Sequence, residues 1–595
     1  MSEPLPVTVE MVLNMTRDGK KAHEARVPVY DHAYDVYRAT QKADSGKQKW
    51  ESTMRVPYGL QTIDTTLVNI VGDVPRSEIR PRRPQDAATA PLMQRLLDYH
   101  VDEDHLDESW PLFVWQALVY PLSVAKVHWL YKESERVGRD FIPNPADPHV
   151  PIPLERPERL VLRDGPTFEP WNIYDAWWEP MARDVDSAAY FVLRSWESPD
   201  DIRKKTKSEQ NPFGQYDEAA VAELLKSSPK GAGDQLSSLE RYKRGTSDKR
   251  KGRYEVLEVW QDEALVVVAD ERVVLRAIPN PFWHGRKPVV AAQTRIDGFE
   301  LMGIGETELL DDLQQTLWSI EQAAMDNLHM TVHRGFTYRE TGVFDVSKLT
   351  VKPRFMWPVQ DHDDIRPVDM PQLGSDVYRQ MDTLLSRMQL VTGINPYVSG
   401  TQSVGTDQTT ATGITALTDI ASRLLRFKAR MLASKGLQRT FELWGDLVQQ
   451  FMDRQTAIRI EGPGETIDWQ TIDPQDIVGN YDYSVRGVEE SLSRQQQRGE
   501  VIALLNAFAP FAQLGIINWP PLLRKVAEAY DFPTPNALVK PAPEAQPPAA
   551  PGGMPPQNGG QPPQGSPQIP PQVPTTLDGT PYGPPVAGAI TGGGR

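Results

Sequence analysis

The chain has 595 residues, of which 80 are acidic and 64 basic, so its formal net charge is −16, and it contains no cysteine. The length exceeds that of a typical domain severalfold, so we expect several domains or an elongated molecule. The missing cysteine excludes disulfide scaffolds, thiol catalysis and zinc sites with cysteine ligands, and the acidic balance argues against a surface that is basic all over for tight DNA binding.

The first 302 residues are predicted to form a mixed α/β domain. Helices are expected where apolar residues recur at steps of three and four, and antiparallel strands where β-branched residues alternate with others. The helices fall at 30–42 and 91–105, an apolar helical or buried stretch at 63–71, a core segment rich in large apolar side chains at 109–129, and the strands at 254–260, 264–270 and 271–277.

Residues 303–333 have the pattern of one long helix with an apolar and a polar side. No lysine or arginine lies between Arg295 and Arg334, whereas acidic residues are frequent there. The apolar side consists of Leu310, Leu313, Leu317, Ile320, Ala324 and Leu328, and the polar side of Asp311, Asp312, Gln315, Ser319, Gln322 and Asp326. The sequence therefore predicts a rod with one packing side and one acidic side.

Prolines interrupt the helical pattern within 334–371, where two short strands are expected at 336–340 and 347–355. A second helix is predicted over 374–392. Residues 393–413 are rich in Gly, Ser and Thr, and they form a loop that is too long for an ordinary connection.

A third helical pattern covers residues 409–453 and carries no acidic residue between Asp419 and Glu442. Gly436 and Gly445 are positions where this helix could bend. Its basic residues in that interval are Arg423, Arg426, Lys428, Arg430, Lys435 and Arg439. Short strands are expected after it, at 457–461 and 481–488.

The last helical block, 490–530, contains an uncharged run at 501–523 that is long enough to cross a bilayer. Its prolines and amide side chains favour a buried helix and turn instead. The chain does not open on a secretory signal pattern, so we expect a soluble protein without membrane contact. Residues 533–595 are almost half proline and glycine, and they are expected to be a disordered or extended arm.

No motif in the sequence supports an enzyme. Gly400 and Gly405 have the spacing of a phosphate-binding loop, but Thr406 stands where such a loop needs lysine. His329 and His333 lie one helical turn apart, but neither an adjacent glutamate nor a third metal ligand accompanies them. The sequence therefore predicts no catalytic residue, no cofactor and no metal.

The order of these elements resembles the portal (head–tail connector) proteins of tailed bacteriophages. The resemblance rests on three stretches, 49–82, 284–327 and 393–432 without 401–408, and their order and spacing match that family over roughly residues 30–490. The Pro/Gly-rich arm lies outside the shared pattern. No single motif decides the resemblance, so its specificity lies in the combination.

The resemblance implies an α+β subunit of a ring, usually of twelve copies, at one vertex of the capsid. Its parts would be an N-terminal wing, a stem of two helices, a clip inserted between them, a tunnel loop, a long wing helix and a helical crown. On this chain they correspond to 1–302 (wing), 303–333 and 372–392 (stem), 334–371 (clip), 393–411 (tunnel loop), 412–490 (long helix and rest of the wing), 491–532 (crown) and 533–595 (arm).

The resemblance also implies partners and a place in the cell. Double-stranded DNA would pass through the ring without being read, the clip would meet the terminase large subunit and later a head–tail adaptor, and the ring would contact the major capsid or scaffolding protein. The protein would assemble in the host cytoplasm and remain in the virion, at the portal vertex. The family itself hydrolyses nothing, which agrees with the missing lysine at Thr406.

Candidate site residues follow from these assignments. An acidic channel lining would repel phosphates and let DNA slide, whereas a basic one would bind phosphates at every step. The channel candidates are Asp311, Asp312, Asp326, Ser399, Thr401, Ser403, Arg423, Arg426, Lys428 and Arg430, and the candidates for packing between subunits are Leu310, Leu313, Leu317 and Ile320. Two alternatives stay open, another neck or tail subunit of a virion and a nucleic-acid-processing enzyme.

Overall fold

The computed structural model divides the chain into two units, Met1–Lys540 and Pro541–Arg595, and the residues that it describes all belong to the first. These residues are 6–40, 46–72, 75–142, 152–206, 215–229, 252–333, 335–339, 365–369, 373–394, 423–453, 456–461 and 467–486. The expected crown (491–532) and arm (533–595), nearly all of the tunnel loop and much of the clip therefore lie outside the described residues.

Helices dominate the N-terminal part: α1 (Val9–Arg38), α2 (Tyr58–Val71), α3 (Ala90–Glu103) and α4 (Leu106–Val119). The helix predicted at 91–105 is confirmed as α3, and the apolar stretch at 63–71 belongs to α2. The helix predicted at 30–42 is confirmed over 30–38 as the carboxyl end of α1, but its predicted start is wrong, because α1 begins 21 residues earlier, after the Thr8 cap. The first half of α1 is buried partly through polar or small residues, Thr16, Gly19 and His23, so it shows no apolar period.

Two antiparallel sheets follow. The five-stranded sheet has the order β4-β5-β6-β7-β8 and contains the three strands that the sequence predicts. The three-stranded sheet, β3-β2-β9, contains a hairpin of two 20-residue strands that was not predicted, because its sequence is charged and interrupted by prolines. The strands are β2 (Ser123–Ile142), β3 (Ile152–Trp171), β4 (Ala176–Trp178), β5 (Phe191–Glu197), β6 (Tyr254–Trp260), β7 (Ala264–Ala269), β8 (Val273–Pro279) and β9 (Val289–Ala292).

Three two-stranded ladders complete the described strands: β1 (Arg76–Pro81) with β14 (Tyr481–Arg486), β10 (Phe336–Tyr338) with β11 (Ile365–Pro367), and β12 (Thr456–Glu461) with β13 (Ile467–Ile472). The pairing of β1 with β14 joins residues about 400 positions apart in the sequence. Short helices α5 (Pro199–Thr206) and α6 (Glu218–Leu224) flank the five-stranded sheet.

Large aromatic side chains build the main core, which joins α2–α4, both sheets and α11 (Arg439–Phe451). Trp110, Phe113, Trp178, Phe191 and Trp444 are all almost completely buried. Each such burial contributes on the order of 2–3 kcal/mol. The prediction of a core segment at 109–129 is confirmed by α4 and the start of β2.

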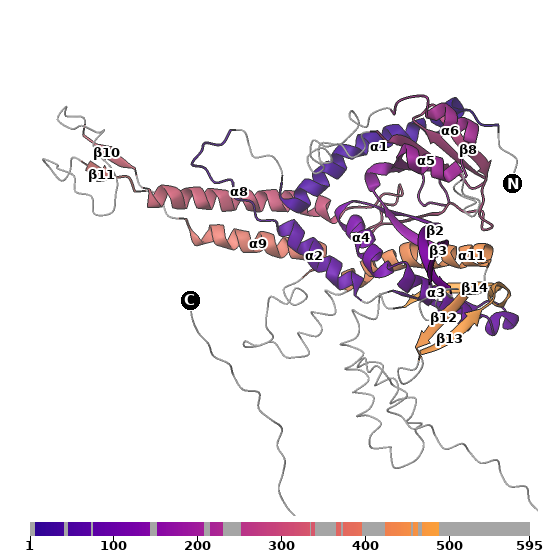
Figure 1. Ribbon diagram of the computed structural model, residues 1–595. Coiled ribbons are helices and arrows are strands. Elements are labelled where there is room, and N and C mark those ends of the chain that lie inside the picture. Colours follow the sequence, from indigo (N-terminus) through magenta and orange to yellow (C-terminus); the bar gives the residue numbers. More distant parts are fainter. Residues whose placement is uncertain are drawn as a thin grey trace, which may run out of the picture. The chain divides into compact units, whose positions relative to one another are not determined.

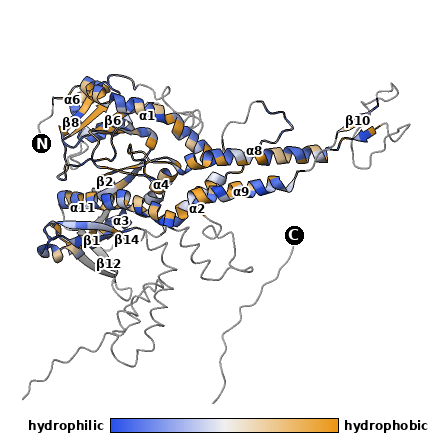
Figure 2. Cartoon of the chain, turned by 180° about the vertical axis from the view of Figure 1, so that it is seen from behind, coloured by the Kyte–Doolittle hydropathy of each residue, from blue (hydrophilic) through white to orange (hydrophobic). Residues whose placement is uncertain are grey.

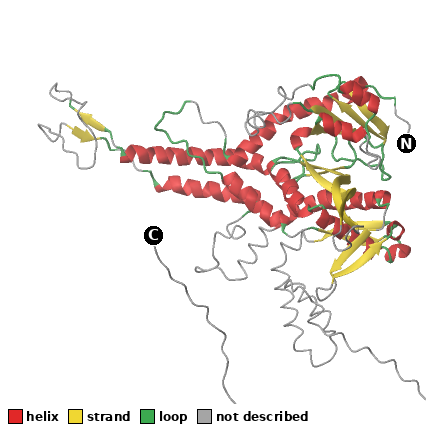
Figure 3. Ribbon diagram, viewed as in Figure 1, coloured by secondary structure: helices red, strands yellow, loops and turns green. Residues whose placement is uncertain are grey.

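Two long helices, α8 (Glu306–Val332) and α9 (Ser375–Thr392), run side by side (Figures 1 and 3). They confirm the helices predicted over 303–333 and 374–392. At 1.5 Å per residue α8 is roughly 40 Å long. Figure 2 shows apolar and polar residues along both helices, a pattern that the sequence predicts for α8.

The third helical pattern is described from residue 423 onward. Residues 423–432 are α-helical, Ala433–Gln438 form a π-helical stretch, and α11 continues to Phe451. The π-helical stretch contains Gly436, one of the two glycines at which a bend was possible. The other, Gly445, serves packing, because a Cβ there would lie 2.0 Å from the Tyr483 hydroxyl oxygen.

Candidate functional site

The contact between α8 and α9 is an apolar seam. Leu310 and Leu317 of α8 are fully buried against Leu384 and Met388 of α9. Leu313, Ile320, Met381 and Leu385 border this seam and are only partly buried. Of the four residues expected to pack between subunits, Leu310 and Leu317 thus form the inside of a helical pair within one chain, whereas Leu313 and Ile320 retain some accessible surface.

A strap, defined as residues 46–59, lies against another side of α8. Its carboxyl end is held by side chains of α8: Trp318 Nε1 donates to the Val56 carbonyl at 2.7 Å, and Gln314 Oε1 accepts from the Gly59 N–H at 2.6 Å. The Gln314 amide nitrogen donates to the Val36 carbonyl of α1 at 2.9 Å. One buried glutamine therefore joins α8 to the end of α1 and the start of α2.

The strap also contacts the later turns of α8. The Ser52 N–H donates to Asp326 Oδ1 at 2.5 Å, and Gln322 Nε2 donates to the Met54 carbonyl at 2.7 Å. The Tyr58 hydroxyl donates to Glu321, and burial, together with this carboxylate, raises the pKa of Tyr58. Asp326, a channel candidate, is therefore partly buried and bonded to the strap of its own chain.

The exposed side of α8 is acidic in its first two turns. Glu308 and Asp312 are exposed and lie one turn apart. Asp311 points to a different neighbour, since its Oδ2 lies 2.7 Å from His32 Nε2 and its Oδ1 accepts from Gln315 Nε2 at 2.7 Å. Of the three acidic candidates only Asp312 belongs to the exposed stripe, which is formed by Glu308, Asp312, Gln315, Ser319 and Ala323.

A buried ionic junction lies where α8 begins and α9 ends. Lys428 Nζ is 2.7 Å from Glu306 Oε1, and the two side chains are 0% and 1% exposed. Lys428 also donates to the Thr392 carbonyl at 2.9 Å. Arg295 donates to the same Glu306 oxygen at 3.2 Å and to the Val391 carbonyl at 2.7 Å. We call Arg295, Glu306, Lys428 and these two carbonyls the junction.

The junction matches charge to helix polarity. Glu306 lies in the first turn of α8, where the helix dipole favours an anion, and the two cations meet the last carbonyls of α9, where it favours cations. Burial lowers the pKa of Lys428, and the carboxylate of Glu306 opposes that shift. Lys428, predicted as a DNA-channel residue, is instead a buried structural cation.

The other basic candidates have different positions. Arg423 and Arg430 are exposed on helix 423–432, and Arg426 is partly buried there. Ser399, Thr401 and Ser403 lie outside the described residues. His329 and His333 are both exposed near the end of α8. Within the described part of the chain, no group of three or more His, Asp or Glu side chains is placed to hold a metal ion.

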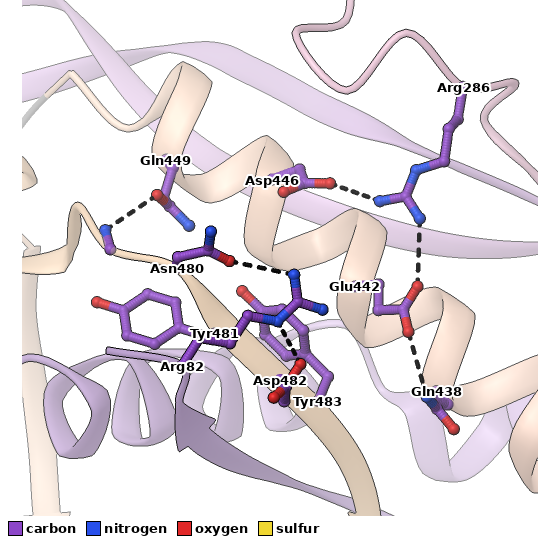
Figure 4. Close-up of a pocket in the computed structure, with 11 residues that line it drawn as sticks. Arg82, Arg286, Gln438, Glu442, Asp446, Gln449, Asn480, Tyr481, Asp482 and Tyr483 are labelled. Carbon is purple, nitrogen blue, oxygen red and sulfur yellow. Dashed lines mark hydrogen bonds and ion pairs between the residues drawn. The ribbon is translucent and has the colours of Figure 1, made fainter. Parts of the chain in front are cut away.

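A polar pocket of about 470 Å³ lies between α11 and β14 (Figure 4). Arg286 bridges two carboxylates of α11, Glu442 at 3.2 Å and Asp446 at 2.7 Å, and Arg82 Nε lies 2.5 Å from Asp482. Burial raises the pKa of Asp446, and Arg286 opposes this. Both arginines are thus already paired with carboxylates. Arg286 links the segment before β9 to α11, and Arg82 links the end of β1 to β14.

Sequence reasoning missed the strap and the junction, although one signal for the junction was present. Lys428 stands three residues after Leu425 and four before Leu432, both fully buried, so it occupies an apolar position of its helix. A cation on an apolar face needs a buried partner. The contact between the strap and α8 could not be predicted from Gln314, because glutamine is common on exposed helix faces.

The comparison with known families covers most of these elements. The family model described as phage SU10 portal protein matches residues 162–572, more than half of the chain, including α8, α9, the junction and α11. The match begins after the stretch 49–82, so that part of the resemblance lies outside it. It extends to 572, so the expectation that the whole Pro/Gly-rich arm lies outside the shared pattern is wrong. No curated protein matches the chain.

Proposed function

As the chain belongs to the phage SU10 portal protein family, we propose that it forms a ring of twelve subunits at one capsid vertex and that the genome is packaged and ejected through this ring. A portal protein is a structural component of the virion. The observation that best supports a channel role is the charge of α8 in the α8–α9 pair. This helix carries an exposed acidic stripe and not one Lys or Arg.

The charge of this stripe suits a passage for DNA. Carboxylates at Glu308 and Asp312 would repel phosphates over a screening length of about 8–10 Å at ordinary ionic strength. Repeated around a ring, they would form an acidic collar. Acidic side chains displace no condensed counterions from duplex DNA. Release of these counterions into solution is what favours the binding of DNA to basic surfaces.

Subunit packing must overcome the repulsion between copies that each carry a net charge of −16. The stem offers apolar surface for this on α8, where Leu313 and Ile320 are half-buried and Leu328 and Val332 are 50% and 67% exposed. We propose that the neighbouring subunit packs against these residues. The fully buried Leu310 and Leu317 contribute indirectly, by holding α8 on α9.

The segment between the two stem helices is the proposed clip. Its described part is the β10–β11 ladder, on which Phe336 and Tyr338 are exposed. Exposed aromatic side chains are frequent anchors in protein interfaces. We propose this segment as the contact for the terminase large subunit and the head–tail adaptor, and the wing and crown as the contact for the major capsid or scaffolding protein.

Electron micrographs of the purified protein test the proposal. We expect end-on views with twelve-fold symmetry and a central hole. A monomer, a filament or a closed disc without a hole would contradict it. The same preparation should neither hydrolyse ATP nor cut DNA with Mg²⁺, and either activity would favour the enzyme alternative.

A further inference from the structure

We propose that Glu306 is a positioning residue that fixes, through Lys428 and Arg295, the two ends of the chain segment between α9 and helix 423–432 against the start of α8. The inference rests on the proposed function in one respect, since this segment is the one expected to reach DNA. A channel role does not by itself require that Glu306 anchor this segment, so the inference goes beyond the proposed function.

The first step of the argument is the geometry at the exit from α9. The Val391 carbonyl accepts from Arg295 and the Thr392 carbonyl from Lys428, at 2.7 and 2.9 Å. Gly393 then ends the helix with a φ of 78°, and a Cβ at that position would lie 2.8 Å from Leu424 Cδ2. The chain therefore leaves α9 in direct contact with the helix on which it returns.

The second step is the return. Lys428 lies on helix 423–432, and its ammonium group bridges the Thr392 carbonyl and Glu306 Oε1. One cation thus links the exit, the return and the first turn of α8. Because all three groups are buried, water does not compete for these hydrogen bonds, and breaking one of them leaves a charge or carbonyl unsatisfied.

The third step is polarity. A simple ion pair would tolerate an exchange of its two charges. Here the carboxylate stands at the amino end of α8 and the ammonium at the carboxyl end of α9, so an exchange would oppose both helix dipoles. It would also place a lysine beside Arg295. The junction therefore predicts that the pair works in one orientation only.

Hydrogen–deuterium exchange on the purified full chain tests the inference. In Lys428→Met and Glu306→Gln we expect exchange to rise roughly tenfold or more in peptides covering 388–394 and 424–432. The five-stranded sheet should keep its wild-type rates. The control Lys435→Met makes the same substitution seven residues later, at a half-buried lysine outside the junction, and should leave both peptides unchanged.

Two double variants complete the test. Glu306→Gln with Lys428→Met removes both fully buried charges. Arg295 keeps the Val391 carbonyl, and its side chain is 23% exposed, so the variant should fold and still exchange rapidly at the junction. Glu306→Lys with Lys428→Glu should exchange as fast as the single variants. Wild-type rates in the swapped variant, or an equal increase over the whole unit, would overturn the inference. Because no DNA or capsid is involved, this result is independent of the micrographs that test the ring.

Discussion

His23 is buried on α1 as a neutral imidazole. Its Nε2 lies 3.0 Å from the Tyr174 carbonyl oxygen, so this nitrogen carries the proton, and its Nδ1 has no hydrogen-bond partner among the described residues. Burial lowers the pKa of His23 to about 4, and the Arg194 cation contributes. The unfolded chain takes up this proton near pH 6.5, before the folded protein does. The free energy of unfolding should therefore fall by about 3 kcal/mol as the pH drops from 6.5 to 4.

Denaturant titrations at pH 7 and pH 4.5 check this pH dependence. His23→Gln keeps a donor for the Tyr174 carbonyl but binds no proton, so it should lose clearly less stability than the wild type between the two values. His329→Gln changes an exposed histidine on α8 and should follow the wild type. Equal losses in all three proteins would show that His23 does not titrate as its burial implies.

At the scale of elements, Gln314 determines how α8, α1 and α2 fit together. Gln314→Leu would leave the Gly59 N–H and the Val36 carbonyl buried without partners, which should cost about 3 kcal/mol. The same substitution one residue later, Gln315→Leu, removes only an exposed hydrogen bond to Asp311 and should cost less than about 0.5 kcal/mol. Thermal and denaturant unfolding of both variants measures the difference. Similar effects would mean that the strap and α1 hold α8 by other contacts.

The same elements show what could be predicted from the sequence. Apolar periodicity gave α8, α9 and the central strands of the larger sheet, because each presents a continuous apolar face. It missed the first half of α1 and the strap, where the buried groups are polar and bonded across large sequence separations, as Gly19 is to Tyr190 at 3.1 Å. It also misassigned Lys428, since a charge was read as an exposed residue without regard to its apolar neighbours.

At the scale of the whole molecule, the net charge and the acidic stripe of α8 lead to a prediction about DNA passage. Asp312→Lys changes the charge of each subunit by two units on the exposed side of α8, away from the apolar seam with α9. Ring assembly should therefore be unchanged, while DNA packaging should slow because each subunit then offers a cation to the phosphates. Glu263→Lys makes the same charge change on an exposed turn of the five-stranded sheet and serves as the control.

The dependence on salt separates an electrostatic cause from any other. At about 0.5 M salt the screening length shrinks to a few ångströms, so added lysines would hold phosphates less firmly. The packaging rate of the Asp312→Lys ring should then approach that of the wild type under the same conditions, whereas the Glu263→Lys ring should match the wild type at every concentration. Equal slowing by both variants would assign the effect to total charge. No slowing by Asp312→Lys would place Asp312 away from the DNA path, and the acidic stripe would then belong to the outside of the ring.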